Sequence, residues 1–87
     1  MQNNQPQNRE ELLQRAEELG FDVYESEQDE FEVYEDDGSL HVNHYGLRVC
    51  PYMEHGQGSS RRDFNKEANY WLQKLGYDYQ YREEGVV

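Results

Sequence analysis

The chain has 87 residues and a formal charge of −11 at pH 7, from 19 Asp and Glu against 8 Lys and Arg, and this length allows one domain. It holds no run of about 20 apolar residues for a membrane span and no signal-peptide pattern in residues 1–11, and its single cysteine, Cys50, excludes a disulfide scaffold and favours a cytoplasmic, reducing compartment. Direct binding to DNA or RNA is not expected, because a negative field of this size repels phosphate.

The helices and strands follow from periodicity and turn signals. We expect a disordered tail over residues 1–7, then a helix with Asn8 as its N-cap, Glu11 as its capping-box partner and Gly20 at its end. Alternating apolar and polar residues predict strands around 21–24, 31–34 and 40–43.

An Asp-Gly pair at 37–38 predicts a hairpin turn between the second and third strands. A fourth strand around 47–49 should end at Pro51, and a second helix should run from a cap at Ser60 to Gly76. The alternation of Tyr77, Tyr79 and Tyr81 predicts a last strand, and residues 84–87 are expected to fray.

These elements predict an α+β fold. Residues 8–83 should form a single domain, a small antiparallel sheet of four to five strands with two helices on one face, in the order α-β-β-β-(β)-α-β.

The net charge comes from one segment of this domain. Eleven acidic residues fall within 17–37, no Lys or Arg occurs between Arg15 and Arg48, and the remaining eight acids balance the eight bases. A halophilic protein would spread its acids over every surface, so this concentration favours an acidic surface made for a partner. A solvated acidic face without a partner is the alternative.

If Phe31 and Val33 face the core, the alternating acids and tyrosines of these strands share the open face of the sheet. Carboxylates two residues apart on a strand are about 6.6 Å apart, which approximates a row of phosphates. Tyrosine adds flat contact area, although Tyr24 and Tyr34 can instead pack against each other across the sheet. The candidate partner-binding residues are Asp22, Tyr24, Glu25, Glu30, Glu32, Tyr34, Glu35, Asp36 and Asp37.

In size, charge and the acidic strands of residues 21–37, the chain resembles the phage-encoded DNA-mimic inhibitors, a class that includes many anti-CRISPR and anti-restriction proteins. The resemblance implies a viral or mobile-element protein that fills the nucleic-acid groove of a host enzyme. The C-terminal half is neutral and carries Arg61 and Arg62, so the mimicry would be one-sided.

Metal binding and catalysis are not expected, and no cofactor is predicted. The zinc-type side chains His41, His44, Cys50 and His55 lack a C-x-x-C pair, and His41 and His44 should point to opposite faces of a strand. No nucleophile motif is present, and a crowded, exposed acidic strand does not shift one carboxyl pKa selectively.

The sequence therefore predicts a non-enzymatic acidic protein that occupies a basic, nucleic-acid-binding surface of a partner protein and inhibits it. The alternative is an accessory or assembly subunit, for example a homodimer, whose interface is the tyrosine-rich strand of Tyr77, Tyr79 and Tyr81.

Overall fold

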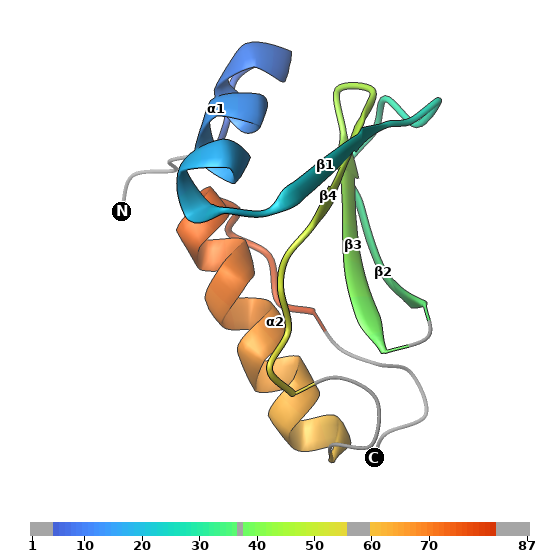
Figure 1. The fold of residues 1–87 in the computed structure, drawn as a ribbon, viewed down its shortest axis with the longest axis vertical. Helices are drawn as coiled ribbons and strands as arrows, with labels where there is room; N and C mark the ends of the chain where they lie inside the picture. The colour runs from blue at the N-terminus through green and yellow to red at the C-terminus, as the bar shows by residue number, and fades with distance from the viewer. Residues whose placement is uncertain (1–4, 37, 56–59, 82–87) are drawn as a thin grey trace.

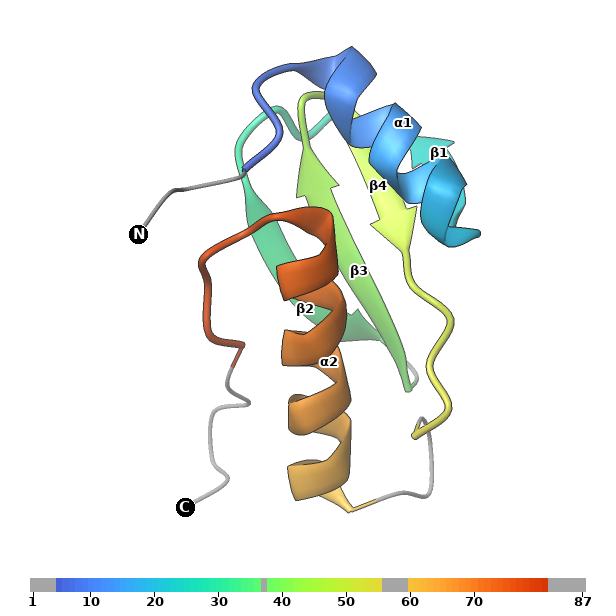
Figure 2. The ribbon, with the colours of Figure 1, turned by 90° about the vertical axis from the view of Figure 1, so that its left-hand side faces the viewer.

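A computed structural model describes residues 5–36, 38–55 and 60–81, which form two helices and a four-stranded antiparallel sheet. Both helices lie on the same side of the sheet in Figure 1, and Figure 2 shows them in front of the strands. This is the α+β fold that the sequence predicted. No described element covers the other face of the sheet.

The first helix, α1 (Arg9–Leu19), begins and ends at the predicted caps. The side chain of Asn8 accepts a hydrogen bond from the backbone N–H of Glu11, and Gly20 ends the helix in the left-handed conformation, at φ 80°. The carboxylate of Glu11 accepts from the N–H of Gln7 at 2.8 Å, one residue before the N–H used in a capping box.

The second helix, α2 (Arg61–Leu75), is capped by Ser60, whose side chain accepts from the N–H of Asp63, and ends at Gly76. Arg15 of α1 donates to the carbonyl of Leu75 at 2.9 Å. This bond satisfies a carbonyl at the C-terminus of α2 and joins the two helices.

The sheet has the strand order β1-β4-β3-β2, so β1 and β2 lie at opposite edges although they are consecutive in sequence. All neighbouring strands are antiparallel. The pairing of Asp36 with Ser39 confirms the hairpin predicted at Asp-Gly. The strands are β1 (Asp22–Glu25), β2 (Glu32–Asp36), β3 (Ser39–His44) and β4 (Leu47–Cys50).

The connection from β1 to β2 crosses the tip of the β3–β4 hairpin. The N–H of Ser26 donates to the carbonyl of Gly46 at 2.9 Å, and the N–H of Gly46 donates to the carbonyl of Gln28 at 3.1 Å. Arg9 holds the same tip from the helix side, since its guanidinium donates to the carbonyl of Gly46 at 3.2 Å.

The core lies between the sheet and the helices. One valine from each strand forms a row across the helix-facing side, and the register places them next to one another: Val23, Val49, Val42 and Val33. Apolar side chains of both helices pack against this side, among them Leu12, Ala16, Phe64, Ala68 and Leu72. Because the helix-facing residues alternate with the others along each strand, the register also decides which side chains reach the open side.

The last predicted strand is wrong. Over Tyr77–Tyr81 the chain pairs with no strand, and the side-chain amide of Asn69 instead bonds both the N–H and the carbonyl of Tyr81, at 2.6 and 3.3 Å. Tyr77 and Tyr81 are buried and Tyr79 is exposed. The period-two pattern therefore reflects alternate packing against α2 and the core, which needs no ladder.

Part of the predicted tail packs against the domain. Pro6 is fully buried, and its carbonyl accepts a hydrogen bond from the hydroxyl of Tyr45 at 2.9 Å. Residues 1–4 of that tail and the residues predicted to fray, 84–87, lie outside the described residues.

Candidate functional site

The uncovered side of the sheet, called here the open face, is a polar surface. Its three carboxylates are exposed, and Arg48 is its only Lys or Arg among the residues that the structure describes. The register gives its members as Asp22, Tyr24, Glu32, Tyr34, Asp36, Ser39, His41, Asn43, Arg48 and Cys50.

Five of the nine predicted residues lie on the open face: Asp22, Tyr24, Glu32, Tyr34 and Asp36. Tyr24 and Tyr34 do not pack against each other, because β4 and β3 separate their strands by about 14 Å. Along β2 the open face carries Glu32, Tyr34 and Asp36, so one aromatic ring lies between two carboxylates.

Glu25 and Glu35 lie on the opposite side of the sheet, which corrects the prediction of one shared face. Each alternates with the open-face residues of its strand and reaches a helix-borne arginine. Glu35 pairs with Arg61 at 2.7 Å in a partly buried contact, and Glu25 pairs with Arg9 at 3.6 Å at the surface. These two carboxylates are neutralised within the chain.

The predicted row of strand carboxylates is also corrected. Glu30 lies in the connection before β2 begins at Glu32, so the two are not neighbours on one strand. The acids of residues 17–37 thus divide between α1, this connection and the sheet. Asp37 lies outside the described residues.

A transverse row of interacting side chains crosses the middle of the open face. Asp22 pairs in register with Cys50, the thiol of Cys50 is 3.2 Å from Nδ1 of His41, and the ring of His41 stacks on Tyr34 at 5.0 Å. The sequence reasoning missed the His41–Cys50 contact, which the two-residue turn of the β3–β4 hairpin determines.

The thiol and the imidazole of this row are both held neutral. Burial raises the pKa of Cys50, with Asp22 acting in the same direction and Arg48 against it. Burial and then Arg48 lower the pKa of His41, against Asp36. The raised pKa keeps the Cys50 thiol protonated, and a protonated thiol is a poor nucleophile.

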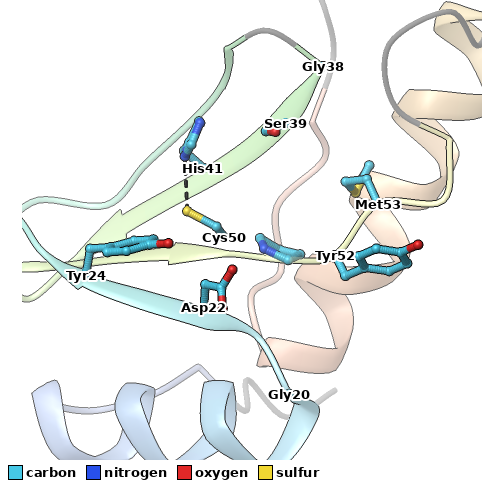
Figure 3. Close-up of a pocket in the computed structure, with 10 residues that line it drawn as sticks. Gly20, Asp22, Tyr24, Gly38, Ser39, His41, Cys50, Tyr52 and Met53 are labelled. Carbon is cyan, nitrogen blue, oxygen red and sulfur yellow. Dashed lines mark hydrogen bonds between the residues drawn. The ribbon is translucent and has the colours of Figure 1, made fainter.

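Part of the open face is hollowed into a groove of about 660 Å³, called here the Asp22 groove. Figure 3 shows the His41–Cys50 contact on one side of it, Asp22 rising from β1, and Tyr24 and Tyr52 on either side of Asp22. Tyr24 and Tyr52 expose 56% and 73% of their surface, so both rings are available to a partner. Tyr52 was not among the predicted site residues.

A second hollow, of about 510 Å³, lies where the β1–β2 connection meets the open face, and Glu32, Asn43 and Arg48 line it. Asn43 is 3% exposed, and its Oδ1 has no hydrogen-bond partner in the described chain, nor has the buried Nε of Arg48. Such atoms destabilise the fold unless water or a ligand reaches them.

The described residues include no group of three or more His, Cys, Asp or Glu that is placed to hold a metal ion. His41 and His44 lie on opposite faces of β3, as the sequence predicted, since His41 contacts Cys50 and His44 contacts the core residue Tyr77. Of the helices that the structure describes, none has the length and apolar character needed to cross a bilayer.

The tyrosine-rich segment offers a smaller surface than the alternative hypothesis requires. Tyr77 and Tyr81 belong to the protein's own core, which leaves Tyr79, 42% exposed, for an interface.

Comparison of the chain with protein-family models, curated proteins and solved structures finds no match. Of the surfaces that the described residues form, the open face is therefore the candidate site for a partner.

Proposed function

We propose that this protein is a small acidic binding protein whose open face docks on a basic surface of a partner protein, and that it acts by occupying a surface that normally holds nucleic acid. The observation that carries the proposal is the composition of the open face. In the described chain no helix or strand covers this side of the sheet, and it presents the exposed carboxylates of Asp22, Glu32 and Asp36 together with the exposed rings of Tyr24 and, at its margin, Tyr52. Such a surface complements a cationic, aromatic-lined channel.

The proposal needs no catalytic group. Occupation of the partner's surface excludes nucleic acid sterically, and the charge of −11 steers the protein toward cationic surfaces, so association should be fast and salt-sensitive. Because the open-face carboxylates lie at the two edges of the sheet, the proposed mimicry is one of sign and surface area, not of a continuous phosphate row. Its setting would be the cytoplasm, the reducing compartment that a single cysteine favours.

The test compares two double charge reversals that change the net charge equally. Glu32→Lys/Asp36→Lys alters the open face, whereas Glu17→Lys/Glu18→Lys alters exposed positions on α1. A partner is first captured from source cells with the wild-type protein and eluted with a salt step. Purified partner is then assayed for nucleic-acid binding with each protein added.

We expect the wild type and the α1 variant to displace nucleic acid from the partner, and the open-face variant to fail. Equal displacement by both variants would mean that the open face is not the interface. Failure of the wild type to displace nucleic acid would refute the proposed inhibition, as would recovery of this protein alone, which would favour self-association.

A further inference from the structure

The Asp22 groove gathers side chains that have no partner within the described chain. Tyr24 and Tyr52 make no ring contact, cation contact or hydrogen bond with described residues, and Asp22 forms no ion pair. The other two well-exposed tyrosines differ: Tyr70 packs on Trp71 at 4.8 Å, and Tyr79 packs on Phe31 at 5.2 Å. Two aromatic rings and one carboxylate that lack these contacts within the described chain therefore line the Asp22 groove.

The electrostatics of the groove favour a cation. None of its described lining residues is a Lys or Arg, and the His41–Cys50 pair on one side of it is uncharged. Asp36 acts on His41 from the β2 side and Asp22 acts on Cys50 from β1, while Arg48 acts on both groups in the opposite sense and more strongly. Arg48 is paired in register with Tyr24 and does not line the groove, and Asp22 is the only Asp, Glu, Lys or Arg among the described lining residues.

The lining residues of the groove suit a long side chain that carries a flat charged head. Pro51 and Met53, the sequence neighbours of Tyr52, also line the groove and offer apolar contact to an aliphatic stem. A guanidinium is planar, forms two parallel hydrogen bonds with a carboxylate, and stacks on an aromatic ring. The ammonium of a lysine carries the same charge, but it is not planar, so it neither forms the two parallel hydrogen bonds nor stacks on a ring as a guanidinium does.

We propose that the Asp22 groove binds one arginine side chain of the basic partner, with the guanidinium on the carboxylate of Asp22 and against the ring of Tyr52. This inference rests on the proposed function, which it deepens by naming the group that the partner inserts. It also makes Tyr52, which lies outside the acidic segment of the sequence, a residue that recognises the partner.

The test uses the full chain and a minimal probe, the peptide acetyl-Gly-Arg-Gly-amide, followed through the aromatic ¹H–¹³C NMR signals of the tyrosines. The matched control peptide carries citrulline, which has nearly the same shape as arginine and no charge. The protein variants are Asp22→Asn and Tyr52→Leu, with Tyr70→Leu as the control at an exposed tyrosine of α2.

We expect the arginine peptide to shift the Tyr52 and Tyr24 signals with a millimolar Kd, and the citrulline peptide to leave them in place. Tyr52→Leu should raise the Kd about two- to fivefold, the range of an exposed cation–π contact. Asp22→Asn should raise it at least as much, and Tyr70→Leu should leave it unchanged. Absence of shifts at Tyr52, equal shifts at Tyr70, or equal binding of citrulline would overturn the groove assignment.

The outcomes for the groove and for the proposed function are distinguishable. If the arginine peptide binds at Tyr52 but the wild-type protein displaces no nucleic acid from its partner, the groove stands and the inhibitor proposal fails. If displacement occurs and depends on Glu32 and Asp36 while the peptide does not bind, the interface stands and the arginine site is wrong.

Discussion

His44 lies in the core, where Nδ1 is 2.7 Å from the hydroxyl of Tyr77 and the ring stacks on Tyr45 at 3.7 Å. Burial raises the pKa of Tyr77, so the hydroxyl keeps its proton and is able to donate a hydrogen bond to an unprotonated Nδ1. Burial also lowers the pKa of His44 below its usual value of 6.5. The fold therefore holds this imidazole neutral, and protonation opposes folding.

This arrangement predicts a pH dependence of stability. Since the pKa of His44 is lower in the folded than in the unfolded protein, its contribution is fully present above pH 6.5 and is lost as the pH falls toward the folded value. Urea denaturation at pH 7.5 and 5.5 should show a lower midpoint at pH 5.5. The pKa of His41 is lowered too, so His41 adds to the loss of stability at low pH. His44→Gln should therefore reduce the drop in the urea midpoint between pH 7.5 and 5.5, and His41→Gln/His44→Gln should reduce this drop further. A double variant with the full wild-type pH response would contradict the assignment.

Asn43 allows a second residue-scale prediction, because its buried Oδ1 has no partner in the described chain. A valine at this strand position removes the unpartnered oxygen and suits a β-strand. Asn43→Val should raise the free energy of unfolding by about 1 kcal/mol, measured by urea denaturation. Ser39→Val, at an exposed position of the same strand, measures the gain from strand propensity alone. Lower stability of Asn43→Val would show that Asn43 has a partner such as bound water.

At the scale of elements, Glu67 of α2 fixes the segment that follows β4. Its carboxylate is 11% exposed and accepts from the backbone N–H groups of Glu54 and His55, at 2.8 and 2.7 Å, and from the indole of Trp71 at 3.2 Å. Burial alone would raise the pKa of Glu67, but these donors together lower it. The segment from Pro51 to His55, which carries Tyr52, therefore depends on one ionised side chain.

Glu67→Gln should destabilise the protein by about 2–3 kcal/mol, because an amide oxygen replaces a charged acceptor of several hydrogen bonds. The native contribution is present above pH 4.5 and is lost as the pH falls below it, since the folded pKa is the lower one. Acid titration of the variant should therefore show less loss of stability below pH 4.5. Glu54→Gln is the control, since the contact there is made by the Glu54 backbone; equal destabilisation by both would refute the role of Glu67.

The element patterns predicted both helices and four strands, because caps, glycine stops and periodicity are local. They failed over Tyr77–Tyr81, where alternation records burial and the backbone groups of Tyr81 bond Asn69 instead of a strand. Period two therefore indicates alternate burial, and a ladder needs a partner strand that local patterns do not reveal.

The candidate site was less predictable, since it depends on which strands are neighbours. One signal for it was present in the sequence. Tyr45 and Gly46 form a two-residue turn with φ of 57° and 76°, and the register it imposes pairs His44 with Leu47. Continued along the hairpin, this register brings His41 beside Cys50. Strand order is a property of the whole chain that local patterns do not predict. It separates Tyr24 from Tyr34 and places the strand of Glu35 at the sheet edge, where Glu35 pairs with Arg61 of α2.

At the scale of the whole molecule, a chain with a formal charge of −11 folds into a body with extents of 34 × 30 × 22 Å. The Debye length is about 30 Å at 0.01 M salt and about 10 Å at 0.1 M. At the lower salt concentration, acids on α1, the β1–β2 connection and the sheet thus repel one another across the molecule. At 0.1 M salt, only acidic side chains that lie close together repel one another.

Added salt should therefore raise the melting temperature between 0.01 and 0.1 M NaCl, because screening weakens this repulsion more than it weakens the few ion pairs. Glu17→Lys/Glu18→Lys, which brings the charge from −11 to −7, should melt higher at 0.01 M and respond less to salt. Differential scanning calorimetry at both salt concentrations measures these changes. A wild-type melting temperature independent of salt would mean that the acids are too far apart to repel. The long-range field invoked for fast association with a basic partner would then be too weak to steer it.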